Sequence, residues 1–442
     1  MPTIILGGGI IGASIAYYLS LQPQPSSQSS SEREEIHIIE SSHTLFSSAS
    51  GYAAGFLAKD WFEPSLLPLG EYSFGLHESL AKEHGGDKKW GFMKGTALSL
   101  GSTDAGVGGA RGDDWLRSGT SRAETATSSP AIVEEGPTWL TRQAGTALER
   151  ISDRGTVAQV DPLRLSHFLL DKALSQGVKL HQPSTATSLI TSASGTITAV
   201  KILNINTKEE STLQCTNLII ASGSWTPRVF STLFPDSSAK MPIYPLAGYS
   251  LVIRSPRYTY TSEHEKEAEG SHAVFTTHPP TAGFAPEMFS REGSEIYIAG
   301  LNSTRIPVPE RVEDLQKYWD EEEMDRLKDV TIRLMGKLPA GQKESTDGVL
   351  NENDLTILRE GLCLRPVSER GVPFVGRVEE SDLGGIKSCK GGGIFVAAGH
   401  GPWGISLALG TGAVMADLVR GVKPSVDVSG LGLGGKARRA KL

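Results

Sequence analysis

The stretch TIILGGGIIG, residues 3–12, decides the fold of this 442-residue chain. Its first four residues form a short apolar run, which is typical of a buried parallel strand. The remainder fits the pattern G-x-G-x-x-G through Gly7, Gly9 and Gly12. In this pattern the first glycine permits a tight turn, the second lets the backbone approach a pyrophosphate, and the third lets a helix pack closely on the strand. The stretch therefore predicts the start of a dinucleotide-binding unit.

A helix is expected directly after the glycines. Ile10 and Ile11 lead into the helix-compatible stretch 13–19. The N–H groups at the start of a helix have no partner within it, and the helix dipole adds a partial positive charge there. We therefore expect the backbone at Ile10 and Ile11 to face the phosphates of a bound dinucleotide.

The second strand of the unit supplies a carboxylate. The apolar run Ile36–Ile39 ends in Glu40, which would accept hydrogen bonds from a ribose. The spacing from Gly12 to Glu40 exceeds the usual ~20 residues. The polar, proline-containing segment 22–31 accounts for the excess as an inserted loop. Because a carboxylate would repel a 2′-phosphate, Glu40 favours FAD or NAD over NADP.

Composition and charge exclude several classes of protein. A chain of 442 residues exceeds the size at which single cores stop growing, about 250–300 residues, so two domains are expected. The formal net charge is −7, which disfavours nucleic-acid binding. Three cysteines suit a reducing compartment, and the scattered histidines and cysteines suggest no metal site. The sequence contains no run of about 18 apolar residues, so we predict no membrane span. The strand expected next to Met1 leaves no room for a signal peptide.

Two further strands end in small residues that could meet a cofactor. The apolar run 218–221 leads into Ser222-Gly223-Ser224-Trp225, and the run 394–398 leads into Gly399-His400-Gly401-Pro402-Trp403-Gly404. A helix is expected over 405–420, so the chain ends with a second strand–glycine loop–helix unit. We expect both strands to join the first unit in one sheet, which makes the cofactor domain discontinuous.

Together these segments resemble the D-amino-acid oxidase/glycine oxidase/sarcosine oxidase family of FAD enzymes. The resemblance spans nearly the whole chain and includes a fungal branch of oxidoreductases that share the ending GHGPWGISLALGTG, residues 399–412. The matching motifs, in chain order, are the first glycines with Glu40, Ser48-Ala49-Ser50-Gly51 with Ala54-Gly55, Val160-Asp161-Pro162, Ala221-Ser222-Gly223-Ser224-Trp225, Arg365-Pro366, Gly371-Val372-Pro373-Phe374-Val375-Gly376, and Gly399-His400-Gly401 with Trp403-Gly404.

The resemblance implies an α/β fold with two domains. A Rossmann-like FAD-binding domain would comprise residues 1–66, 151–240 and 358–428, and an α+β substrate domain with a mixed or antiparallel sheet would comprise 67–150 and 241–357. We interpret 101–136 as a surface excursion of low complexity. Residues 429–442 would form a flexible tail.

The same resemblance assigns the site. The resemblance implies that FAD is bound by the following residues: Gly7, Gly9, Ile10, Ile11, Gly12, Glu40, Ser48, Ser50, Gly51, Ala54, Gly55, Ser222, Gly223, Trp225, Cys363, Gly399, Gly401, Trp403 and Gly404. Cys363 lies where monomeric sarcosine oxidases carry a covalent flavin link, but we favour the interpretation of Cys363 as a small buried residue, since free cysteines are commonly buried.

Two residues are candidates for catalysis. Arg365 would hold a substrate carboxylate with its planar guanidinium, and His400 could act as an acid or base or support the backbone of its loop. The sequence also departs from the family: Ile298 occupies the region where sarcosine oxidases present a lysine that assists the reaction with oxygen, and Phe284 and Tyr297 are the aromatic residues near the glycine oxidase tyrosine.

The sequence therefore predicts an FAD-dependent oxidoreductase that oxidises the C–N bond of a small amine or amino acid, with oxygen as acceptor and hydrogen peroxide as product. The alternatives are an FAD dehydrogenase with another acceptor and a non-catalytic flavin-fold protein that acts in trafficking or interaction. The tail ends in Ala440-Lys441-Leu442, a close variant of the peroxisomal signal S-K-L, so a peroxisomal import receptor is an expected partner. Cytoplasmic location is the alternative.

Overall fold

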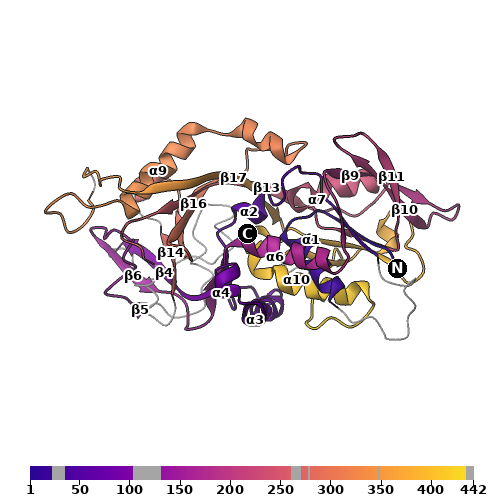
Figure 1. Cartoon of the computed structure of the whole chain (residues 1–442), viewed down its shortest axis with the longest axis horizontal. Helices are drawn as coiled ribbons and strands as arrows, with labels where there is room; N and C mark the ends of the chain where they lie inside the picture. The colour runs from indigo at the N-terminus through magenta and orange to yellow at the C-terminus, as the bar shows by residue number, and fades with distance from the viewer. Residues whose placement is uncertain (22–34, 103–130, 260–269, 277–278, 347, 435–442) are drawn as a thin grey trace.

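A computed structural model describes residues 1–21, 35–102, 131–259, 270–276, 279–346 and 348–434. The molecule is elongated, with two large sheets side by side along its length (Figure 1). One is a six-stranded sheet near the N-terminus, and the other is a ten-stranded sheet at the opposite end. The chain passes between these two parts several times.

The six-stranded sheet contains the predicted dinucleotide-binding unit. Its strand order is β18-β19-β12-β1-β2-β8, and all neighbours are parallel except β18 and β19. The members are β1 (Thr3–Leu6), β2 (Ile36–Ile39), β8 (Lys179–His181), β12 (Asn217–Ile220), β18 (Phe374–Arg377) and β19 (Gly393–Ala398). Every residue of β1, β2 and β12 is buried, as expected for a sheet covered on both faces. The prediction that the two glycine-loop units share one sheet is confirmed.

Helices cover one face of this sheet. They are α1 (Ile10–Ser20), α3 (Leu67–His84), α6 (Pro162–Ser175) and α10 (Gly404–Val419). Asp161 caps α6 by accepting a hydrogen bond from the Arg164 N–H at 3.0 Å, and Pro162 occupies the first turn. In the described part of the chain, the helical run Gly401–Val419 alone is long and apolar enough to cross a membrane, but 78% of that window is buried inside the protein. Its apolar sequence therefore reflects packing against α1 and α3.

A small sheet and one helix cover the other face. The small sheet comprises β9 (Ser184–Thr191), β10 (Ile197–Asn204) and β11 (Glu210–Gln214), and α7 (Thr226–Leu233) packs beside it. These elements share a core with the buried side chains of β1, β12 and β19 that point away from α1.

The two faces of the ten-stranded sheet pack against different parts of the molecule. Its main path is β17-β13-β16-β15-β14-β4-β6-β5, and β3 and β7 pair off this path. The strands are β3 (Phe56–Ala58), β4 (Met93–Ser102), β5 (Ala131–Ile132), β6 (Thr146–Arg150), β7 (Val157–Gln159), β13 (Ile243–Arg254), β14 (Ser271–Thr276), β15 (Glu287–Arg291), β16 (Glu295–Ser303) and β17 (Thr356–Ser368). One face packs on α9 (Glu321–Met335), and the opposite face is turned towards the six-stranded sheet.

Short helices complete the structure. They are α2 (Ala49–Tyr52), α4 (Gly86–Lys89), η3 (Gly223–Trp225), η4 (Pro280–Ala282), η5 (Val312–Tyr318), η6 (Glu380–Asp382), η7 (Gly401–Trp403) and η8 (Ser429–Leu431). The expected FAD-binding segment 358–428 begins inside β17, which spans Thr356–Ser368. This strand pairs with β13 and is therefore part of the ten-stranded sheet. The loop 22–31, most of the excursion 101–136 and the end of the tail lie outside the described residues.

Replacing Gly412 by Ala should destabilise the protein. A Cβ at Gly412 would lie 2.4 Å from Ser14 Oγ and 2.8 Å from Ser14 O, so α10 and α1 would have to separate. We expect a loss of about 1–3 kcal/mol in the free energy of unfolding, measured by urea denaturation. The matched control is Gly75→Ala in α3, where a Cβ has nothing within 4 Å and should add about 0.5–1 kcal/mol. Equal stability of the two variants would contradict the proposed close packing.

Candidate functional site

A cavity of about 570 Å³ lies where the carboxyl ends of the parallel strands meet the ten-stranded sheet. Residues that follow β1, β2, β12 and β19 form one wall, and residues of β15, β16 and β17 form the other. The carboxyl ends of parallel strands are the usual place for a ligand in open α/β sheets. Its volume lies in the range of small-molecule and cofactor sites.

The first glycine turn fits tightly between neighbouring strands. Gly7 has a φ of +110°, and an added Cβ would lie 2.5 Å from Ala221 O. A Cβ at Gly12 would lie 2.0 Å from Gly7 O, so Gly12 lets α1 contact the turn, although Gly12 itself does not line the cavity. Gly7 and Gly9 do line it, as do Ile10 and Ile11 in the first turn of α1. The N-terminus of α1 therefore points into the cavity.

Glu40 lies on the cavity wall beside this turn. One carboxylate oxygen accepts a hydrogen bond from the Gly8 N–H at 2.7 Å, and the other accepts one from the Ser42 N–H at 2.7 Å. Burial raises the pKa of Glu40, and the backbone N–H groups of Ser42 and Gly8 oppose that shift. The carboxylate is thus held in a fixed orientation at the position expected for ribose recognition.

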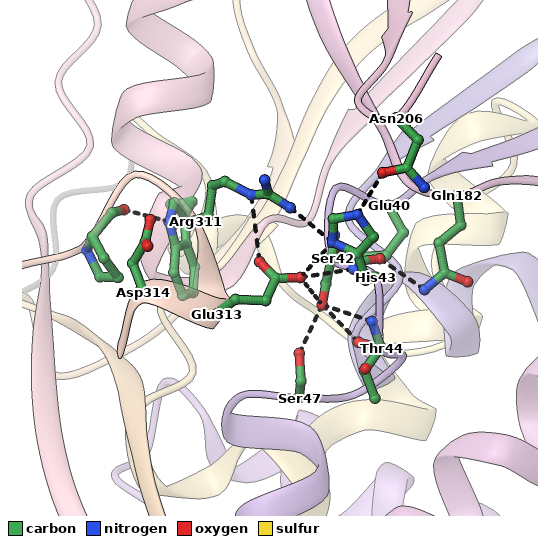
Figure 2. A network of polar contacts seen from close by, with 12 residues as sticks. Glu40, Ser42, His43, Thr44, Ser47, Gln182, Asn206, Arg311, Glu313 and Asp314 are labelled. Carbon is green, nitrogen blue, oxygen red and sulfur yellow. Dashed lines mark hydrogen bonds and ion pairs between the residues drawn. The ribbon is translucent and has the colours of Figure 1, made fainter. Parts of the chain in front are cut away.

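A polar network connects the loop after Glu40 to Asn206 and to the segment 311–313 (Figure 2). Glu313 Oε1 accepts a hydrogen bond from the His43 N–H at 2.8 Å and lies 3.2 Å from Ser42 Oγ. His43 Nε2 lies 2.7 Å from Asn206 Oδ1 in the turn between β10 and β11. Arg311 Nη2 lies 2.7 Å from His43 Nδ1, and both Ser42 and Arg311 line the cavity, so this network forms part of the cavity wall. Sequence reasoning identified none of these contacts.

The loop around α2 forms another part of the wall. Ser48, Ser50, Ala54 and Gly55 line the cavity, and Ser50 Oγ accepts a hydrogen bond from the Ile10 N–H at 2.9 Å. The Ser48 hydroxyl is buried with no hydrogen-bond partner among the described residues, as expected of a group that a ligand would satisfy. Gly51 lies behind this wall, where a Cβ would meet Phe46 O at 2.3 Å.

Two arginines from the ten-stranded sheet hold this loop. Arg291 Nη2 donates to the carbonyl oxygens of Ala53 and Ala54, at 2.6 Å each, and Arg359 Nη1 donates to Gly51 O at 2.9 Å. Arg291 is only 4% exposed, and its burial lowers the pKa of the guanidinium. These contacts fix the backbone of the loop from the far wall of the cavity.

The ends of β12 and β19 supply the remaining cofactor candidates. Ser222, Gly223 and Trp225 line the cavity, and Trp225 Nε1 donates to Pro309 O at 2.9 Å. After β19, Gly401 and Gly404 line it. Two of the predicted residues do not: Gly399 (φ +81°) forms the turn, and Trp403 is buried against Phe56 and Phe62.

His400 lines the cavity, but its ring is bound to the protein. His400 Nε2 lies 3.1 Å from Thr411 Oγ1 in α10, and the residue is only 4% exposed. Burial lowers the pKa of His400 to about 3. The ring is therefore neutral at neutral pH and links the loop before α10 to the middle of that helix.

The substrate candidates gather on the cavity face of the ten-stranded sheet. Arg365 on β17 lies over the backbone of Gly248, where an added Cβ would be 2.8 Å from Nη1, and it donates a hydrogen bond to Asn302 Oδ1. Cys363 lies two residues earlier on the same face, and burial raises its pKa. Tyr297 donates its hydroxyl to Tyr52 O at 3.0 Å, and burial raises its pKa as well. Neither the thiol nor the phenol is ionised at neutral pH.

An irregularity in β16 brings Asn302 to this face. Ala247 pairs with Ser303 and Tyr249 with Gly300, so β16 carries one residue more than β13 between these pairs. Leu301 within this bulge has a φ of +53°. A bulge of this kind changes the side on which the following side chain lies. Asn302, Tyr297 and Glu287 are site residues that sequence reasoning did not select, although Tyr297 was noted.

Stability should fall in acid because two buried histidines stay neutral in the folded protein. Burial lowers the pKa of His400 to about 3 and that of His77 to about 4, whereas an unfolded histidine binds a proton near pH 6.5. Below pH 6.5 the unfolded chain therefore binds protons that the folded protein does not, and stability is lost as the pH falls. At pH 5 we expect a loss of about 2 kcal/mol for each histidine in urea titrations.

His400→Gln should remove the contribution of His400, about 2 kcal/mol at pH 5, because glutamine can contact Thr411 without titrating. The same slope in the variant and the wild type between pH 7 and 5 would contradict this assignment.

Comparison with known proteins agrees with this geometry. The chain is 25% identical over 433 residues to Putative oxidoreductase C1F5.03c of Schizosaccharomyces pombe, covering 94% of this chain and 93% of that protein. It is 24% identical to Putative oxidoreductase TDA3 of Saccharomyces cerevisiae, covering 97% and 93%. Glycine oxidase from Geobacillus kaustophilus has the same fold, with a TM-score of 0.66, 21% identity, and coverage of 98% and 97%.

The features of the cavity fit FAD. The glycine turn, the open N-terminus of α1, the Glu40 carboxylate and the unsatisfied Ser48 hydroxyl are the groups that a dinucleotide would require. The family model for FAD dependent oxidoreductases (DAO) matches residues 3–418. This chain therefore belongs to the DAO family of FAD-dependent oxidoreductases.

Proposed function

We propose that this enzyme oxidises the C–N bond of a small amino acid or related amine. The observation that carries the proposal is Arg365, which lies on the cavity wall opposite the glycine turns and is held by Asn302. A guanidinium in such a position can bind a carboxylate with two parallel hydrogen bonds. FAD, when bound, supplies the acceptor for the hydride that leaves the substrate Cα.

In this reaction the side chains of the protein orient the substrate and do not exchange protons with it. Arg365 fixes the carboxylate and so aligns the Cα–H bond with the cofactor. His400, Tyr297 and Cys363 are all neutral at neutral pH because they are buried, so none of them is a strong base. The substrate therefore reacts with its amine already neutral. Loss of hydride from the neutral amine leaves a protonated imine, which water hydrolyses to a carbonyl compound and ammonium or a protonated amine.

The N-terminus of α10 adds electrostatic support. Gly401, Gly404 and Ile405 at its start line the cavity, and the first turn of α10 contains no acidic residue. Backbone N–H groups at a helix N-terminus stabilise negative charge that develops during reaction. This end of α10 favours reduction of the cofactor.

Oxygen is the proposed electron acceptor, and hydrogen peroxide is the proposed product. A dehydrogenase with another acceptor is a second candidate. The cavity favours it because the Ile298 region, where sarcosine oxidases present a lysine that assists the reaction with oxygen, supplies no lysine to the described cavity wall. Lys208 is the only lysine among the described cavity-lining residues, and it follows β10 on the side of the small sheet. Ile298 faces α9 rather than the cavity.

The test of the proposal is a flavin absorbance measurement. We expect purified protein to be yellow and to bleach when amino acids or amines are added without oxygen. Admitting oxygen then restores the colour and yields peroxide in an oxidase, whereas slow restoration favours the dehydrogenase. A bound flavin that no amine or amino acid bleaches would support the non-catalytic alternative.

Arg365→Ala should weaken carboxylate substrates selectively. Loss of the guanidinium leaves a carboxylate without its partner, and we expect kcat/KM to fall by the equivalent of about 2–5 kcal/mol. An amine without a carboxylate should be affected much less. The matched control is Arg254→Ala, which removes a largely exposed arginine from the end of β13, 3.9 Å from Glu295 and away from the cavity. Equal kinetics of Arg365→Ala and wild type with a carboxylate substrate would refute the role of Arg365.

The tail leads us to propose peroxisomal location, where peroxide could be removed. The supporting residues are Ala440-Lys441-Leu442, which lie outside the described part of the structure. A fluorescent protein fused to the N-terminus should co-localise with a peroxisomal marker, and deleting the three residues should release it to the cytoplasm. Diffuse fluorescence of the intact fusion would favour the cytoplasmic alternative.

A further inference from the structure

One part of the cavity wall comes from the connection between β16 and η5, and none of its residues was selected from the sequence. Glu310, Arg311 and Val312 line the cavity in succession. Arg311 and Val312 are half-buried and Glu310 is exposed, so this connection has the cavity on one side and solvent on the other. Its residues take no part in the chemistry proposed above. We refer to residues 309–313 as the strap.

One end of the strap is held by residues that follow β12. Pro309 is buried, and its carbonyl oxygen accepts hydrogen bonds from Trp225 Nε1 at 2.9 Å and from Arg228 Nη1 at 2.7 Å. Arg228 Nη2 also donates to the carbonyl oxygen of the preceding residue, Val308, at 2.8 Å. Three N–H donors therefore fix two consecutive carbonyl groups at this end.

The other end of the strap is held by the loop that follows β2 (Figure 2). Glu313 Oε1 accepts the hydrogen bond from the His43 N–H and lies 3.1 Å from His43 Nδ1. Burial would raise the pKa of Glu313, but the His43 N–H and ring, together with Arg311, outweigh burial and lower that pKa overall. The carboxylate is therefore charged at neutral pH. We call this contact between Glu313 and His43 the latch, and neither of the two residues lines the cavity.

The order of the strands places the strap across the glycine turn. β1 lies between β12 and β2 in the six-stranded sheet. Because the strap is attached beyond the end of β12 and beyond the end of β2, it crosses the end of β1, where the turn with Gly7 and Gly9 begins. The turn and the strap line the same cavity. The strap therefore separates the dinucleotide-binding part of the cavity from solvent.

We propose that the strap retains FAD and that opening of the latch sets the rate at which the cofactor leaves. The two ends of the strap differ in strength. Pro309 is buried, whereas the side chains of His43 and Glu313 are 40% and 37% exposed, and contacts between exposed charged groups are weak. The latch therefore opens first, and the strap stays attached at Pro309. The inference rests on FAD as the cofactor and not on the proposed oxidation of amines.

Exchange of labelled FAD tests the proposal without turnover. Holoenzyme is mixed with an excess of radiolabelled FAD, and the label that stays with the protein through gel filtration is followed over time. Glu313→Ala should accelerate exchange at least about fivefold, because the strap loses its contact with His43 while every cavity-lining side chain is kept. Glu313→Gln should have a smaller effect, because its amide oxygen can still accept a hydrogen bond from the His43 N–H.

The matched control is Asp314→Ala. It removes the neighbouring carboxylate, which lies 2.7 Å from Lys317 Nζ on the same short helix and outside the cavity. This variant should exchange FAD at the wild-type rate. Equal acceleration by Asp314→Ala and Glu313→Ala would overturn the proposal, since the effect would then belong to η5 as a whole. Equal exchange in Glu313→Ala and wild type would overturn it as well.

A double-mutant cycle shows whether Glu313 acts through His43. His43→Ala removes the ring and keeps the N–H, so both single variants weaken the same contact. The double variant should therefore accelerate exchange by less than the product of the two single effects. Fully multiplicative effects would contradict the latch. Latch-dependent exchange in a protein that no amine or amino acid bleaches would support the strap and overturn the proposed oxidation alone.

Discussion

The close approach of three backbone segments at Gly7 is the constraint on which the rest of the structure depends. The turn after β1 passes so near the end of β12 that a side chain at Gly7 would collide with Ala221, and α1 begins so near the turn that only glycine fits at position 12. This contact brings the ends of β1 and β12 and the N-terminus of α1 to one point. The cofactor cavity is the space that remains beyond it, and the ten-stranded sheet closes that space.

The ten-stranded sheet can close the cavity because one of its faces packs on α9 and the opposite face lines the cavity. One face packs on α9 with large apolar side chains, which fixes the sheet as a rigid wall. The opposite face has small residues where the substrate would lie and long polar residues at the margins. Arg291 and Arg359 extend from this face to the carbonyl groups of the α2 loop, so the two walls are joined by hydrogen bonds across the cofactor cavity. Among the described residues, the Arg291 guanidinium donates to the carbonyl oxygens of Ala53 and Ala54, which keeps its positive charge beside this loop.

Those parts of the fold and site that depend on short local patterns could be predicted from the sequence. The first glycine turn, Glu40, the cap at Asp161 and the loop after β19 each combine a fixed backbone geometry with few residue types. Tyr297 and Glu287 depend instead on which strands pair and in what register, which a single sequence does not encode locally. Asn302 depends on a bulge at Leu301, a residue type that rarely has a positive φ. The alternation of side chains between the two faces of the strand 287–291 was the available signal, but it does not show which of the two faces meets a ligand.

The charges in the cavity also explain how one site can recognise a substrate without titrating near neutral pH. Three ionisable groups that line the cavity, His400, Tyr297 and Cys363, are held neutral because burial disfavours their charged forms. Recognition of a substrate carboxylate would then depend on Arg365. In the proposed reaction, none of these three groups would be a strong base for the proton of the substrate amine. The pKa of the substrate's own amine would therefore set the pH at which the proposed reaction begins.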